Sequence, residues 1–239
     1  MWKPLFICGC PRSGTSALRN VFNADPRFAL GMERYYSRGS TTFSLKREHF
    51  SKSRFYDLQE GDTFWASLDN CSSNKSYFDD SIYRGDKIPL LYKHLQSLFI
   101  EMPDSTVLFI VRDIYEVAAS YNVRAKDEND SLWARNQDFK VAVDDWNESL
   151  VHFYQSFQER KEKVIPIFFD DFFSNEAALD VIFRKLGLNN EYIDFVPFVS
   201  KYIDIKTKKK DTILSYEEKN YISENANLKL LAWLKEKFK

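Results

Sequence analysis

The sequence has few cysteines, little net charge and no long hydrophobic run, and each shortage excludes a class of protein. Its three cysteines (Cys8, Cys10 and Cys71) are an odd number without metal-site spacing, which indicates free thiols and a reducing compartment. A net charge of −1 argues against a general nucleic-acid binder, although a local basic pocket stays open. No apolar run is long enough to span a membrane, and no signal peptide precedes the first expected strand, so we expect a cytoplasmic protein.

Hydrophobic and aromatic residues are abundant. Hydrophobic residues make up 44% of the 239 positions, enough for the core of one domain or at most two. Buried-strand patterns occur at residues 5–8, 28–30, 106–111 and 164–169. Helical patterns follow them at residues 15–23, 90–101, 114–123 and 141–160, and from a cap at Ser174 to Leu186. This alternation predicts an α/β fold, three-layered and P-loop-like, with a central, mostly parallel sheet flanked by helices.

Two segments interrupt the alternation. Residues 35–83 are irregular, polar and aromatic, with a short helix expected at Asp62–Leu68, and we interpret them as a loop-rich insertion in a single domain, 1–239. Arg84–Pro89 (RGDKIP) has the composition of a turn. Near the C-terminus, Ser215 and Glu218 are spaced as a capping box that begins a helix.

The segment Leu5–Phe22, LFICGCPRSGTSALRNVF, predicts an anion-binding loop. A strand leads into Gly9–Gly14 and then into a helix, and the N–H groups and dipole of a helix N-terminus favour anions. The spacing is that of the P-loop, G-x-x-x-x-G, but Thr15 stands where nucleotide triphosphatases have lysine. The cation comes earlier, at Arg12.

The strand Thr106–Val111 ends in Arg112, not in the aspartate that would hold Mg²⁺ in a triphosphatase or kinase. Arginine at a strand end suits a second anionic group. The two segments together predict a pocket that holds two anions without a metal.

These two segments resemble the two cofactor signatures of the sulfotransferases that use 3′-phosphoadenosine 5′-phosphosulfate (PAPS) and release adenosine 3′,5′-bisphosphate (PAP). The residues are CPRSGTSALRNVF and VLFIVRDIYEVAAS, and Val164–Leu188 gives a weaker match. The loop is most similar to the Pro-Arg-Ser-Gly-Thr form of tyrosylprotein sulfotransferases and many bacterial enzymes. The resemblance implies in-line transfer of a sulfuryl group to an acceptor hydroxyl, without a metal.

The resemblance also implies residue roles. The 5′-phosphosulfate would be held by the first signature, and the 3′-phosphate by Arg112 and Ser120. Glu33 would be the base that accepts the proton of the acceptor hydroxyl, and Lys87 would stabilise the sulfuryl oxygens together with Arg12. The first-signature residues are Arg12, Ser13, Gly14, Thr15 and Ser16.

Each role has an ordinary structural alternative. Glu33 and Lys87 have the composition of surface turns, Arg112 could pair with a local carboxylate, and Ser120 could pack within a helix. The three histidines (His49, His94 and His152) are weaker candidates for the base. The family's loop over the adenosine is not recognisable, and either Ser200–Lys201 or the Lys206–Lys210 run is a candidate to replace it.

The acceptor could be a carbohydrate, a phenol or a peptide tyrosine, and residues 35–83 would shape its site. Two other functions stay open at this point. One is a P-loop kinase that uses Arg12 in place of lysine, and the other is a nucleotide-binding module without catalysis.

Overall fold

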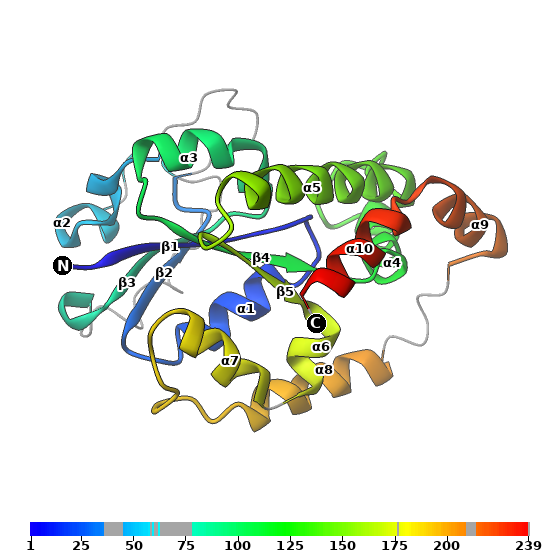
Figure 1. Cartoon of the computed structure of the whole chain (residues 1–239). Helices are drawn as coiled ribbons and strands as arrows, with labels where there is room; N and C mark the ends of the chain where they lie inside the picture. Colours follow the sequence, from blue (N-terminus) through cyan, green and yellow to red (C-terminus); the bar gives the residue numbers. More distant parts are fainter. Residues whose placement is uncertain are drawn as a thin grey trace.

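A five-stranded, entirely parallel sheet forms the centre of the molecule (Figure 1). The computed structural model describes residues 1–35, 45–57, 59, 62, 78–175, 177–208 and 214–238. The strands are β1 (Lys3–Cys8), β2 (Phe28–Met32), β3 (Tyr83–Lys87), β4 (Thr106–Val111) and β5 (Val164–Phe168). Their order in the sheet is β2-β3-β1-β4-β5. The predicted α/β architecture is therefore confirmed.

Helices cover both faces of this sheet (Figure 1). One face carries η3 (Pro89–His94), α3 (Leu95–Glu101) and α5 (Phe139–Glu159), and the other carries α1 (Thr15–Phe22), α6 (Phe169–Ser174) and α7 (Ala177–Lys185). The remaining helical elements are η1 (Arg47–Phe50), α2 (Lys52–Phe55), α4 (Ile114–Lys126), α8 (Val196–Lys208), α9 (Tyr216–Asn225) and α10 (Leu228–Lys237).

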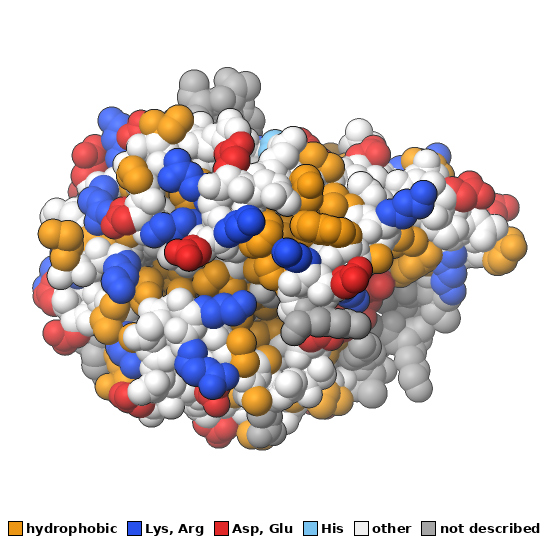
Figure 2. All heavy atoms as spheres, viewed as in Figure 1, with side chains coloured by type: hydrophobic (Ala, Val, Ile, Leu, Met, Phe, Trp, Pro, Cys, Tyr) orange, Lys and Arg blue, Asp and Glu red, His pale blue; other side chains and the backbone are white. Residues whose placement is uncertain are grey.

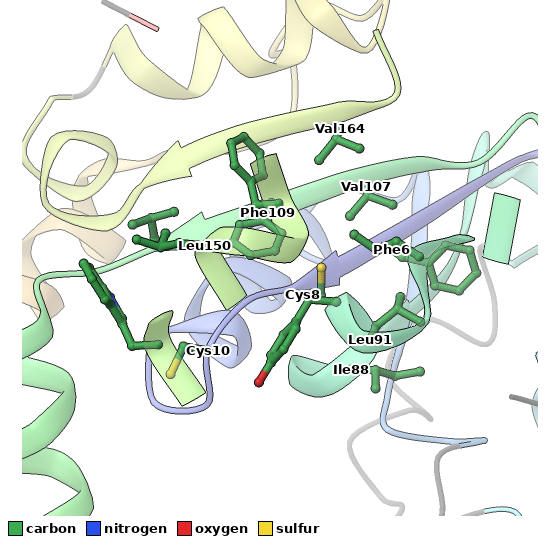
Figure 3. Packing of buried hydrophobic residues seen from close by; sticks show 14 of the residues in the cluster. Phe6, Cys8, Cys10, Ile88, Leu91, Val107, Phe109, Leu150 and Val164 are labelled. Atoms are coloured by element: carbon green, nitrogen blue, oxygen red, sulfur yellow. The ribbon is translucent and has the colours of Figure 1, made fainter. Parts of the chain in front are cut away.

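Alternate side chains of the strands enter two separate cores. Phe6, Cys8 and Phe109 pack on the side of α3 and α5, as Figure 3 shows for this cluster. Leu5 and Ile7 point the other way, toward α1, α6 and α7. Both faces of β1 and β4 are buried, which explains why these strands are unbroken apolar runs in the sequence.

The prediction of a turn at Arg84–Pro89 is wrong. Residues Tyr83–Lys87 form β3, which pairs with both β1 and β2 near the middle of the sheet. The segment carries Arg84, Asp86 and Lys87, which are unusual in a buried strand, and this composition favoured a turn. Arg112 consequently follows the fourth strand in the chain, not the third.

Helix ends were predicted with mixed success. Ser174 ends α6 and does not cap the next helix; the side chain of Asn175 accepts the Ala177 N–H instead. The helical pattern was expected to reach Leu186, and Gly187 follows it in the left-handed conformation (φ 74°). The capping box of Ser215 and Glu218 is present.

Several predictions fall on residues outside the described ranges. Most of the insertion 35–83 does, as do Cys71, the expected helix Asp62–Leu68 beyond Asp62, and Lys209–Lys210. Within the described residues, no helix is both long and apolar enough to cross a bilayer.

Basic and acidic side chains both occur on the face of the molecule shown in Figure 2.

Candidate active site

The loop between β1 and α1 presents an unfilled helix N-terminus. Gly14 occupies the N-cap position of α1, and neither a side-chain cap nor an acidic residue in the first turn neutralises the N–H groups there. The Ser13 side chain is fully buried, and its Oγ lies beside the Cys10 thiol. The backbone N–H groups at this helix N-terminus have the arrangement expected of an anion-binding loop.

Gly14 is required where it stands, for two reasons. Its φ is 95°, and a Cβ there would lie 2.2 Å from Cε2 of Phe169. The same phenyl ring lies under the guanidinium of Arg112, with the Cζ atom 4.3 Å from the ring centroid. Phe169 thus packs against both the loop and Arg112. Sequence reasoning missed this residue because its role depends on contacts between distant segments.

Arg12 and Ser120 are brought together by the fold. Arg12 Nε donates to Ser120 Oγ over 3.0 Å, across 108 residues of sequence, and Nη1 of Arg112 donates to the Arg12 carbonyl over 3.4 Å. Partial burial, together with the charges of Arg124 and Arg112, lowers the pKa of Arg12. Among the described residues, Arg12 has no ion-pair partner. The positive charges of Arg112 and Arg124 disfavour a further unpaired cation here, and an anion bound beside Arg12 would offset that repulsion.

Arg124 is a further member of this cluster that sequence reasoning did not identify. It lies one helical turn beyond Ser120 on α4, and its positive charge lowers the pKa of Arg12. Its side chain pairs with Asp130 at 2.5 Å and stacks on Trp133, 4.5 Å from the ring centroid. The i, i+4 spacing from Ser120 was the available signal, because residues four apart share a helix face.

Arg112 also makes the local ion pair that the sequence left open. Its Nε donates to Glu116 Oε2 over 2.8 Å, one turn into α4. The side chain is only 9% exposed, so the pair reduces the cost of burying this charge. The structural alternative and the functional role are compatible, because Glu116 leaves part of the guanidinium free to contact a second anion.

A second group of side chains lies at the ends of β2 and β3. Lys87 Nζ and Glu33 Oε1 are 2.5 Å apart, and their side chains are 4% and 18% exposed. These residues are therefore neither a turn lysine nor a fully solvated turn glutamate. Register places Lys87 beside Met32 of β2 and Ile7 of β1, so the pair stands next to the loop.

The backbone at two of these positions is strained. Among the described residues, Arg12 (φ 69°) and Glu33 (φ 54°) are the non-glycine residues with left-handed φ. This conformation costs a side-chain-bearing residue roughly 1–2 kcal/mol. Strained residues cluster at functional sites, and here they are the proposed cation and the proposed base.

Comparison with known proteins places the chain in a family. A family model described as "Sulfotransferase family" matches residues 4–192. The chain belongs to the sulfotransferase family. No curated protein sequence matches it.

Solved sulfotransferases share the fold of this family member. A sulfotransferase domain from the curacin biosynthetic pathway aligns at 15% identity and a TM-score of 0.54, over 83% of this chain and 77% of that domain. Sulfotransferase STF1 from Mycobacterium tuberculosis H37Rv aligns at 17% identity and a TM-score of 0.53, over 84% of this chain and 72% of that one.

The other candidate residues of this sulfotransferase lie in helical segments. His94 ends η3, and His152 lies on α5 with its Nε2 3.8 Å from Glu148. The ring of His49 stacks on Tyr35. Ser200 and Lys201 lie within α8 and not in a loop.

Two observations concern the cysteines and the metal-ligating side chains. Cys8 and Cys10 are free and buried, as predicted, and burial raises the pKa of both thiols. No group of three metal-ligating side chains occurs within the described part of the chain.

Proposed function

We propose that this sulfotransferase moves a sulfuryl group from PAPS to an acceptor hydroxyl, with Glu33 as the base. One observation carries the proposal: an uncapped helix N-terminus with a guanidinium cluster stands beside a Lys87–Glu33 pair, at the ends of neighbouring strands. Ligands in parallel sheets bind at this edge. PAPS supplies the activated sulfuryl group, and transfer leaves PAP.

The donor side of the site has the chemistry that a phosphosulfate and a 3′-phosphate require. The loop would hold the 5′ end through its backbone amides, Arg12 and the hydroxyls of Thr15 and Ser16. The uncapped N-terminus of α1 supports this assignment, since its N–H groups favour an anion. Arg112, Ser120 and Arg124 would hold the 3′-phosphate.

The acceptor side would activate the attacking hydroxyl. Glu33 would accept its proton, and Lys87 would turn from Glu33 toward the sulfuryl oxygens once the donor is bound. Lys87 would thus contact Glu33 before the donor binds and the sulfuryl oxygens afterwards, so its ammonium group stays charged and oriented throughout. It also frees the Glu33 carboxylate when the acceptor arrives. The insertion 35–83 would shape the acceptor site, in keeping with its aromatic and polar composition.

A kinase is less well supported. The carboxylate of Asp113, which stands near the position of the Mg²⁺-binding aspartate, caps α4 by accepting the N–H groups of Tyr115 and Glu116. Its acceptor capacity is partly used by the helix. A magnesium site at this strand end would need those bonds to be replaced.

A thermal-shift experiment distinguishes the candidates. PAP at 100 times its Kd should stabilise the protein by about 2.7 kcal/mol, whereas Mg-ATP should have little effect. AMP, which lacks the 3′-phosphate, serves as the matched ligand control. Arg12→Ala should abolish the PAP response, and Arg160→Ala, which removes an arginine packed on Phe99, should not. A response to Mg-ATP but not to PAP would refute the proposal.

Turnover separates an enzyme from a binding module. PAPS is incubated with a panel of carbohydrate, phenol and tyrosine-peptide acceptors, and PAP release is measured. We expect acceptor-dependent release that Glu33→Gln removes. PAP binding without release on any acceptor would favour the module without catalysis.

A further inference from the structure

Asp86 is a buried acid that the proposed chemistry does not use. It lies in β3 between β2 and β1, and no part of it is exposed. Its Oδ2 accepts the backbone N–H of Arg34 at 2.7 Å, while its Oδ1 has no hydrogen-bond partner in the described part of the chain. Burying a carboxyl with so few partners costs free energy, so its presence in a central strand needs a physical reason.

The reason lies in the strained turn at Glu33. The N–H of Glu33 donates to the carbonyl of Lys87 over 3.0 Å, and the next N–H, that of Arg34, donates to Asp86. Consecutive residues of β3 therefore hold both peptide groups that flank the Cα atom of Glu33. These two bonds oppose the relaxation of Glu33 to a negative φ, which would swing its carboxylate away from Lys87.

The neighbouring strand leaves room for this contact. A Cβ on Gly31 would lie 2.9 Å from Asp86 Oδ1 and 2.5 Å from Cγ of Arg34. Any side chain at position 31 would displace the carboxyl or the Arg34 side chain. The absence of a side chain on Gly31 thus allows Asp86 to reach the Arg34 N–H.

We propose that Asp86 is a positioning residue that holds Glu33 in its left-handed turn beside Lys87. Its importance for catalysis rests on the proposed function, in which Glu33 is the base. The contact itself is a property of the ligand-free fold and can be tested there.

The role requires an acceptor oxygen and not a charge. Burial raises the pKa of Asp86 to about 7, opposed by the Arg34 N–H and by Lys87 and Arg19, and reinforced by Glu33. The ionised and the protonated carboxyl both keep an oxygen that can accept the Arg34 N–H. Asparagine should therefore replace Asp86 in this role, whereas alanine should not.

The test is amide hydrogen exchange, followed by NMR in the ligand-free protein. In Asp86→Ala, the amides of Glu33 and Arg34 should exchange roughly ten- to a hundredfold faster, because a hydrogen bond to a carboxyl is lost. Asp86→Asn should stay within about threefold of the wild type. The serine hydroxyl in Asp86→Ser is too short to reach the Arg34 N–H. This variant therefore takes the place of Asp86→Ala in the exchange measurement if Asp86→Ala folds poorly.

Asp25→Ala is the matched control. Asp25 is an equally buried aspartate near the opposite end of β2, where it pairs with Arg27. Its loss should leave the Glu33 and Arg34 amides protected. Unchanged exchange in Asp86→Ala, equally fast exchange in Asp86→Asn, or the same acceleration in Asp25→Ala would each overturn the proposal.

Turnover then separates positioning from a general structural role. With an acceptor that the wild type sulfates, Asp86→Ala should lower kcat about ten- to a hundredfold and leave the KM for PAPS within about threefold. Asp86→Asn should restore kcat. Failure of the wild type to bind PAP would refute the proposed function, but it would not alter the exchange result.

Discussion

Replacement of Gly14 by alanine tests how the loop is built against the sheet. Gly14 has a φ of 95°, and an added Cβ would stand 2.2 Å from Cε2 and 2.5 Å from Cδ2 of Phe169. Gly187 also has a left-handed φ, 74°, but an added Cβ there would meet nothing within 4 Å. An alanine at either position would therefore have an unfavourable left-handed backbone, but only at position 14 would its Cβ overlap another side chain.

The expected magnitudes follow from this difference. Left-handed backbone costs an alanine roughly 1–2 kcal/mol, which is the whole effect expected for Gly187→Ala. Gly14→Ala adds an overlap with a buried ring, which typically costs a further 1–3 kcal/mol or so. Its total should be about 2–5 kcal/mol. For a chain of this length, each kcal/mol lowers Tm by about 2–4 °C.

The assay is urea unfolding followed by fluorescence, with PAP titration calorimetry on the folded variants. Because Phe169 also lies against Arg112, movement of the ring should weaken PAP binding in Gly14→Ala and leave it intact in Gly187→Ala. Phe169→Leu in the Gly14→Ala background should recover part of the lost stability by removing the overlap. If Gly14→Ala is no less stable than Gly187→Ala, the packing argument is wrong.

Three further predictions concern the site. Arg112→Ala and Arg124→Ala should each weaken PAP binding about ten- to a hundredfold, since each removes charge-assisted hydrogen bonds to a phosphate. Titration calorimetry measures this affinity, and an unchanged Kd would exclude that residue from the phosphate site. Glu33→Gln should keep PAP affinity within about threefold and lower kcat by about 10²–10⁴, and full turnover would exclude Glu33 as the base. The pKa of Asp86 is about 7 in the folded state and about 3.9 in the unfolded state. Between these pH values the folded state binds more protons than the unfolded state. The free energy of unfolding therefore falls as pH rises from about 4 to 7. Asp86→Asn should flatten that decline in urea titrations at several pH values, and an unchanged decline would contradict the burial of an ionisable carboxyl.

The sequence alone determined the elements whose signals are local. Unbroken apolar runs mark β1 and β4 because both faces of these strands are buried, and glycine spacing marks the loop that precedes α1. Arg12 and Arg112 were recognisable because they follow apolar strand patterns, and parallel strands bring their carboxyl ends to one edge, whereas Glu33 was assigned from the family resemblance.

Tertiary structure decided what depends on pairing between distant segments. β3 carries a turn-like sequence and becomes a strand only because β1 and β2 flank it. Contacts across 54 residues join Lys87 to Glu33, and contacts across 108 residues join Arg12 to Ser120. Phe169, Arg124 and Asp86 act through such contacts as well. No short window of sequence holds both partners, so their roles emerge only when the sheet assembles.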